Sequence, residues 1–183
     1  SDNVQMTEHG PAGGAGHLGN ITLNTGNLEV SDSGKIYSGT RGDGDGGEIS
    51  AFTDALLISS GGMLFTQTDG KGGGGAIRVE GDLMEIRGPG GIYSATNANG
   101  DGGDISLSAR TLSLDDKGTI LAETRGTGRG GDVALDTADL DVMGGGVIQT
   151  FTYASGHGGN ISVTAQESVS LSGFQTISES GDQ

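Results

Sequence analysis

Acidic residues recur in the glycine-rich stretches of this chain, where their spacing could build a cation site. Hard cations such as Ca²⁺ need several oxygen ligands in a flexible loop, and stacked carboxylates repel one another without a cation. However, Lys71, Ala76 and Arg129 interrupt the acidic positions, and the nonapeptide signature of calcium β-rolls is missing. Capping of turns by the side chains is therefore the preferred interpretation, and a Ca²⁺ cofactor site is the alternative. Its candidate ligands are Asp43, Asp45, Asp101, Asp104 and Asp132.

Two further carboxylates could hydrolyse a glycosidic bond. Asp54 and Asp82 hold the same position in successive copies of an internal repeat, which places them one above the other, near the separation that retaining glycosidases use. Arg110 follows at the same spacing, so a ladder of opposite charges is the simpler account. The chain's histidines are scattered through other segments and support neither a Ser-His-Asp triad nor a metal site: His9, His17 and His157. We therefore expect no catalysis.

Hydroxyl residues recur with the same spacing, two positions apart. Such an array could form an ice-binding face, but counting by twos from the apolar Ile36, Ile92 or Ile148 places the hydroxyls inside the fold. The sequence thus predicts interior hydroxyl ladders that hydrogen-bond between coils. The ladder residues are Thr40, Thr68, Thr96, Thr124 and Thr152.

Aromatic residues occupy the alternate positions of the same segments. Tyr37, Phe65 and Tyr93 are spaced by one repeat and are followed at that spacing by Leu121 and Gln149. An outward column of rings is a candidate contact stripe for a partner or a second fibre. The alternative is that the rings only stabilise neighbouring coils.

The elements that position these residues follow from the internal repeat. A Gly-Gly step followed by a polar residue and an apolar residue marks each copy of this 28-residue unit, beginning at Gly46, Gly74, Gly102, Gly130 and Gly158. A repeat of constant length predicts stacked units that bury their apolar faces only against each other. The expected single domain, 1–183, divides into an irregular first partial coil and six coils: 1–17, 18–45, 46–73, 74–101, 102–129, 130–157 and 158–183.

Apolar residues alternate with period two inside each repeat, which predicts strands and no helices. Three short strands are expected per repeat, exemplified by Ile105/Leu107, Leu112/Leu114 and a third that starts at Ile120. Stacking strands about 4.8 Å apart gives an all-β, right-handed, three-sided parallel β-helix of about six coils. A glycine precedes each third strand, where we expect a positive φ: Gly34, Gly62, Gly90, Gly118 and Gly146.

Composition limits the function. The chain has 39 glycines without a collagen period, and its aligned aliphatic residues argue against disorder. It lacks cysteine, which fits either a reduced compartment or an exported Gram-negative surface protein that avoids periplasmic oxidation, and the type of repeat favours the second. A net charge of −15 repels nucleic acid and anionic membranes. No signal peptide, membrane span or lipidation motif is recognised.

The repeat that runs from Gly102 to Gly131 carries a family resemblance. Its pattern Gly-Gly-Asp-Ile-Ser-Leu, then Leu-Ser-Leu, then Gly-x-Ile-x-Ala-x-Thr-x-Gly-x-Gly-x-Gly-Gly resembles the repeats of large bacterial exoproteins of the filamentous haemagglutinin type, over residues 18 to 180. The resemblance implies a right-handed β-helix in a secreted adhesin or surface fibre, commonly exported by two-partner secretion.

The sequence therefore predicts a non-enzymatic, extracellular β-solenoid that holds shape, spans distance and presents turns for adhesion, with a host or cell-surface glycan as a partner. Neither end carries a capping element, so the segment is expected to continue in a larger exoprotein or to stack end to end. A polysaccharide-active β-helix enzyme is the first alternative, and a calcium-dependent binding module the second.

Overall fold

The structure is a computed structural model that describes residues 5–9, by backbone path, and 19–173. Every regular element in these ranges is a strand, and the described residues contain no helix. The strands are β1 (Gln5–His9), β2 (Ile21–Val30), β3 (Lys35–Thr40), β4 (Ile49–Ile58), β5 (Met63–Thr68), β6 (Ile77–Glu80), β7 (Leu83–Arg87), β8 (Gly91–Thr96), β9 (Ile105–Asp115), β10 (Thr119–Thr124), β11 (Val133–Val142), β12 (Val147–Thr152) and β13 (Ile161–Leu171).

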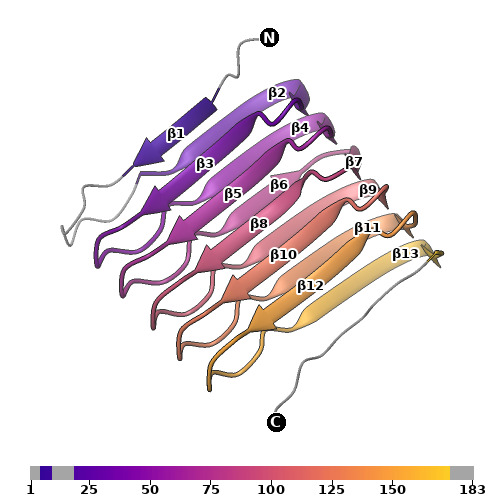
Figure 1. Cartoon of the computed structure of the whole chain (residues 1–183). Helices are drawn as coiled ribbons and strands as arrows, with labels where there is room; N and C mark the ends of the chain where they lie inside the picture. The colour runs from indigo at the N-terminus through magenta and orange to yellow at the C-terminus, as the bar shows by residue number, and fades with distance from the viewer. Residues whose placement is uncertain (1–4, 10–18, 174–183) are drawn as a thin grey trace.

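The strands stack in parallel as a β-solenoid (Figure 1). One sheet has the order β1-β3-β5-β8-β10-β12, and a seven-stranded sheet runs β13-β11-β9-β6-β4-β2, with β7 joined to β4 and β9. Paired residues in adjacent coils are one repeat apart in the sequence, as in Leu64↔Ile92. The predicted all-β parallel solenoid is confirmed. It has about five turns, and the predicted six coils and three sides are not confirmed.

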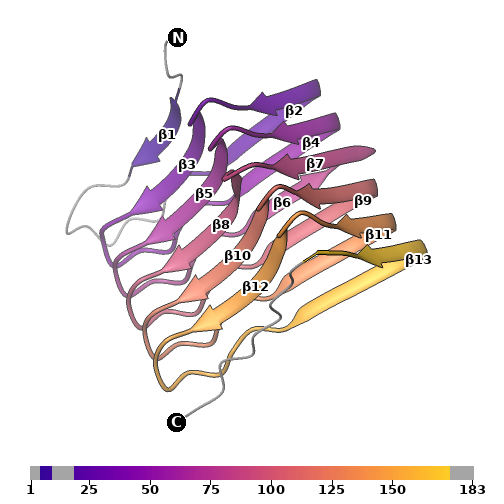
Figure 2. The ribbon, with the colours of Figure 1, turned by 45° about the vertical axis from the view of Figure 1, so that its right-hand side comes forward.

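The first and second predicted strands of a repeat are one continuous strand in all described coils except the third, where β6 and β7 are separate (Figure 2). The alternation nevertheless changes phase within each long strand. In β9, Ile105, Leu107 and Ala109 are buried, and the next buried residue is Leu112, three positions on. Two successive side chains therefore leave the core, because the strand bends around it. This bend is why the sequence pattern resembles two strands.

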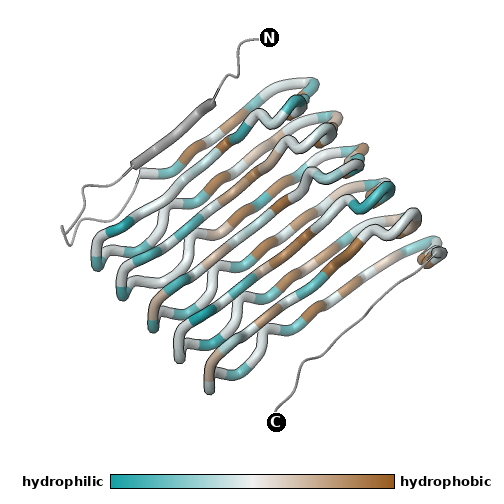
Figure 3. The backbone as a smooth tube through the Cα atoms, viewed as in Figure 1, coloured by the Kyte–Doolittle hydropathy of each residue, from teal (hydrophilic) through white to brown (hydrophobic). Residues whose placement is uncertain are grey.

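The core is a set of aliphatic columns, a column being residues that lie over one another in successive coils. Hydrophobic bands cross the strands in Figure 3, and the largest side chains, among them Leu64, Ile92 and Ile120, are fully buried. Each inward residue packs against the coils on either side, so a narrow core needs few aromatic residues. Aliphatic residues at regular spacing are thus sufficient to define the fold.

The positive φ expected just before each third strand is wrong. The residues with positive φ lie one or two positions earlier, as at Lys117 and Gly145, ahead of Gly118 and Gly146. Glycine is required at Gly118 for a different reason: a Cβ there would lie well inside 3.0 Å of the Ile86 carbonyl in the preceding coil. Close approach of backbones, and not left-handed geometry, excludes larger residues from this column.

The Gly-Gly step has the same cause. A Cβ on the second glycine would meet the carbonyl of its counterpart one coil earlier, as Gly103 would meet Gly75. A Cβ on the first glycine would meet the amide of the following coil and a buried hydroxyl, as Gly102 would meet Gly131 and Thr124. The glycines therefore let coils approach within hydrogen-bonding distance where no side chain fits.

The two ends of the stack differ from its middle. Strand β1 pairs with β3 through Gln5↔Lys35, whereas a register of one repeat would bring Thr7 beside Lys35. Strand β13 carries one extra residue, because its pairing with β11 shifts after Thr137 and resumes at Asp139↔Ser168. The third strand expected at Ile177 lies outside the described residues. The right-handedness stays a prediction.

Candidate functional site

The structure buries most of the predicted hydroxyl column. Thr40, Thr68, Thr96 and Thr124 are at most 2% exposed, and Thr152 is partly exposed. Buried hydroxyls cannot contact an ice surface. The period-two alternation predicted that this column faces inward, and the burial of its threonines agrees with that prediction.

The hydroxyl partners are carbonyls of the glycine-rich loop. Thr68 Oγ1 donates to the Gly73 carbonyl at 3.2 Å, and Thr66 Oγ1 donates to the Gly75 carbonyl at 2.7 Å. Ser94 Oγ, one coil on, donates to the same Gly75 oxygen at 3.1 Å. The hydroxyls therefore fasten the loop to the sheet and to the neighbouring coil, a role that the predicted hydroxyl ladder only approximated.

The aspartates proposed as metal ligands accept backbone hydrogen bonds from the next coil. Asp104 Oδ1 accepts from the Asp132 amide at 2.8 Å, and Asp132 Oδ1 accepts from the Asn160 amide at 2.7 Å. Asp45 and Asp101 bind the amides of the equivalent loop positions one coil on, at 2.7 and 2.8 Å. We call these bonds coil-to-coil clips. They join residues that are 28 positions apart in successive coils, whereas the preferred interpretation had expected capping within a turn.

Basic residues neutralise the same loops. Arg129 donates to both carboxylate oxygens of Asp132, at 2.6 and 2.5 Å, and Lys71 lies 3.9 Å from Asp43. The Arg129 hydrogen bond, assisted by the Asn160 amide, lowers the pKa of Asp132 below its ordinary value. Across the described residues, no group of three His, Cys, Asp or Glu side chains is arranged to hold a metal ion.

The carboxylates proposed for hydrolysis lie at the bend of the long strands. Asp54 and Asp82 are both exposed, and the Asp82 amide donates to the Asp54 carbonyl at 3.1 Å. Arg110 is also exposed and forms no ion pair with any described residue, so the expected charge ladder is not present. His157 is exposed in a loop, while the side chains of His9 and His17 lie outside the described residues.

The predicted aromatic stripe lies on the outer face of the six-stranded sheet. The ring centroids of Tyr37 and Phe65 are 5.4 Å apart, and those of Phe65 and Tyr93 are 6.4 Å apart with an edge-to-face arrangement. All three rings are partly exposed, and burial raises the pKa of the Tyr37 hydroxyl. The column therefore stabilises neighbouring coils and also leaves ring surface open to solvent.

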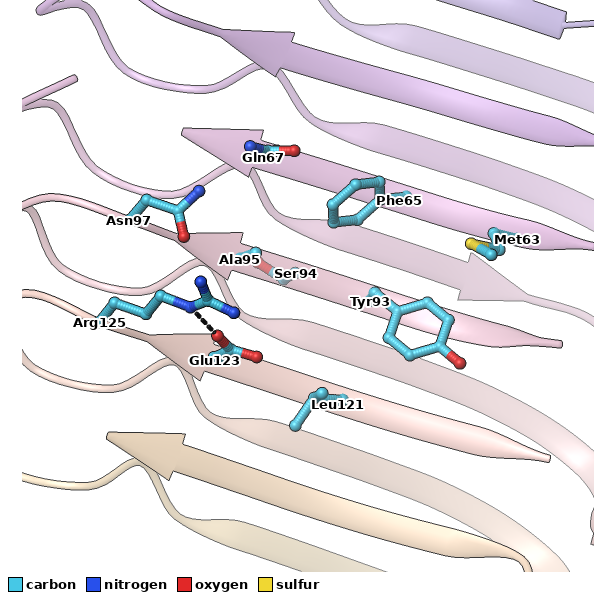
Figure 4. Close-up of a pocket in the computed structure, with 10 residues that line it drawn as sticks. All are labelled: Met63, Phe65, Gln67, Tyr93, Ser94, Ala95, Asn97, Leu121, Glu123 and Arg125. Atoms are coloured by element: carbon cyan, nitrogen blue, oxygen red, sulfur yellow. Dashed lines mark hydrogen bonds and ion pairs between the residues drawn. The ribbon is translucent and has the colours of Figure 1, made fainter. Parts of the chain in front are cut away.

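A hollow of about 380 Å³ adjoins this stripe, and we call it the outer hollow (Figure 4). It spans β5, β8 and β10, with Ala95 at its centre. In that outward column the neighbouring coils carry the larger Gln67 and Glu123. One small residue between two long ones leaves space on an otherwise filled face. The lining residues are Met63, Phe65, Gln67, Tyr93, Ser94, Ala95, Asn97, Leu121, Glu123 and Arg125.

The position of Tyr93 keeps the hollow open. A Cβ on Gly91 would lie 2.8 Å from two atoms of the Tyr93 ring, so this ring lies over Gly91, on the side away from Ala95. Figure 4 shows the ring turned toward the start of β8.

Polar side chains along the opposite side of the hollow are held by neighbours. The amide nitrogens of Gln67 and Asn97 both donate to Asp69 Oδ1, at 2.7 and 2.6 Å. Arg125 Nε donates to Glu123, which raises the pKa of the guanidinium, and its Cζ lies 5.6 Å from the Tyr153 ring centroid. The rim is therefore partly ordered before any ligand arrives.

Sequence reasoning found the aromatic column and missed the outer hollow. The missing signal was present at the spacing of the repeat, as Ala95 between Gln67 and Glu123. A small residue between two large ones in a column indicates a surface depression only if the column faces solvent, and the structure establishes that for this column.

Comparisons with known proteins place no relative beside this chain: no family model, no curated protein and no solved structure matches it. The described residues include no helix that is long and apolar enough to cross a membrane.

Proposed function

We propose that this β-solenoid is a structural, adhesive segment of an extracellular bacterial surface fibre. The observation that supports it is the parallel stack, in which the same apolar columns and backbone ladder repeat from coil to coil and clips join several of the coils. Such a stack resists bending, and each additional repeat lengthens it by about 4.8 Å. An adhesin stalk of the haemagglutinin type needs these properties.

End-to-end stacking is the assembly that we propose. Ile161, Val163, Val169 and Leu171 in β13 are 41–55% exposed, although the same columns are almost fully buried in β9. This exposed row, which we call the β13 row, could be covered by β2 of a second copy or by a further coil of a longer exoprotein, as β4 covers β2. Because β13 contains an extra residue, only its segment Ile161–Ala165 pairs with β11 at the spacing of one repeat.

Electron microscopy of the purified chain at physiological salt tests this assembly. We expect filaments with coils spaced by about 4.8 Å along the axis. Val163→Lys places a charge in the β13 row and should leave isolated rods. Ser162→Lys, the adjacent residue on the same strand with the opposite orientation, is the matched control and should still form filaments. Filaments that persist in Val163→Lys would contradict stacking through this row.

The extracellular location is tested separately in the organism that carries the chain. An antibody against the purified protein should label intact cells as strongly as permeabilised cells. Labelling that requires permeabilisation would place the protein inside the cell and refute a surface role, whatever the microscopy of the purified chain shows.

A further inference from the structure

We propose that the outer hollow binds a neutral hexose-containing glycan. This inference rests on the adhesive part of the proposed function and extends it by naming a site and a class of ligand. The outer hollow has a volume of about 380 Å³, which lies at the lower end of the range of about 300–1,000 Å³ that is typical of small-molecule sites. One or two sugar units match that size.

The apolar surface of the hollow suits one face of a sugar ring. A pyranose presents C–H groups on its face and hydroxyls at its edge, so it packs against an aromatic or aliphatic wall. Phe65, Tyr93 and Leu121 form such a wall across three coils, and Ala95 admits a ring close to the sheet. Aromatic rings supply large contact areas with few rotatable bonds.

The polar rim suits the hydroxyls. A hydroxyl both donates and accepts, so a sugar edge is best matched by mixed donors and acceptors. Gln67 and Asn97 have their amide nitrogens engaged by Asp69, which leaves the amide oxygens to accept. Glu123 adds an acceptor and Arg125 adds guanidinium donors. These rim groups stand beside the apolar wall in Figure 4, so one sugar can meet both.

Charge and strand pairing favour a neutral glycan over other ligands. The net charge of −15 on the chain repels polyanions, and the single carboxylate and single guanidinium of the hollow pair with each other, so the lining presents no net charge to a ligand. β5, β8 and β10 are each paired on both sides, so the hollow offers no free backbone edge to an extended peptide. A ligand must therefore bind through side chains alone.

The test uses the 183-residue chain and tetrasaccharides of glucose, galactose and mannose, with saturation-transfer NMR and titration of tyrosine fluorescence. Heparin and sialyllactose serve as anionic probes. Ala95→Gln fills the hollow with a residue that its own column already accepts at Gln67, so folding should be preserved. Tyr93→Ala removes the wall, and Phe52→Ala, an exposed ring on the other sheet, is the matched control.

We expect at least one neutral tetrasaccharide to bind, with saturation transfer to aromatic protons. Tyr93→Ala should weaken binding at least about fivefold, the size expected for an anchor residue. Ala95→Gln should abolish binding, and Phe52→Ala should leave it unchanged.

No binding of any neutral sugar, equal binding by Ala95→Gln, or binding of the anionic probes alone would overturn the proposal. Binding is measured in parallel on the Val163→Lys chain, so the presence or loss of filaments does not bear on this result, and neither does cytoplasmic labelling. A failure of the filament test or of the surface test can therefore be told apart from a failure of glycan binding.

Discussion

The close approach of coils at the Gly-Gly step makes a single methyl group decisive. Gly102→Ala would place Cβ well inside 3.0 Å of the Gly131 amide nitrogen in the next coil and of the buried Thr124 hydroxyl at the end of β10. Gly158 holds the same position in the repeat two coils later, and a Cβ there would lie within 4 Å of no atom of the described residues. Gly158→Ala is therefore a matched control, because it changes the backbone freedom of the chain in the same way without the steric clash.

The magnitude follows from three terms. Inserting a methyl group into packed structure costs about 1–3 kcal/mol. Pushing the coils apart also strains the bond from the Gly102 amide to the Arg129 carbonyl, 2.7 Å long, which contributes about 0.5–1.5 kcal/mol. Alanine also lowers the conformational entropy of the unfolded chain, which stabilises the folded state by about 0.4–1 kcal/mol. Gly102→Ala should therefore destabilise the fold by about 0.5–4 kcal/mol, and Gly158→Ala should be neutral or slightly stabilising.

Equilibrium unfolding in urea, followed by circular dichroism, measures both variants. We expect the midpoint to fall for Gly102→Ala with an unchanged slope, because the surface exposed on unfolding stays the same. Amide hydrogen exchange around residues 102–131 should increase in parallel. Equal midpoints for the two alanine variants would refute the argument that backbone approach, and not turn geometry, requires these glycines.

Two further predictions concern polar groups. Thr124 Oγ1 has no hydrogen-bond partner among the described residues, whereas Thr68 Oγ1, in the same column, binds the Gly73 carbonyl. Thr124→Val should therefore be neutral or stabilise by up to about 1 kcal/mol in urea unfolding, while Thr68→Val should destabilise by about 1 kcal/mol; the reverse order would contradict this assignment. The lowered pKa of Asp132 adds stability that is fully present above its unfolded pKa of about 3.9 and is lost as the pH falls through the lower folded value. Thermal melts from about pH 6 to about pH 2 should show a smaller acid loss for Asp132→Asn, and identical profiles would rule out a contribution from this carboxylate.

Much of the fold could be predicted because the repeat is a one-dimensional signal. The spacing of Ile105, Leu107, Leu112 and Leu114 predicted strands, their inward faces and their stacking, since alternation with period two permits no other element. The third strand was also predicted, together with the inward position of Thr96. What failed was the division of β9 into two strands, because the bend changes which side faces inward without breaking the backbone ladder.

The period, the parallel stack and the core follow from the amino-acid sequence, because each depends only on residues repeated at equal intervals along the chain. The three-dimensional structure alone reveals how the space between successive coils is filled. It showed that Gly118 accommodates a neighbouring carbonyl, that Asp104 clips the next coil, and that Ala95 lies at the centre of a hollow. These facts depend on distances of a few ångströms between atoms of adjacent coils, and such distances cannot be read from the spacing of residues along the chain.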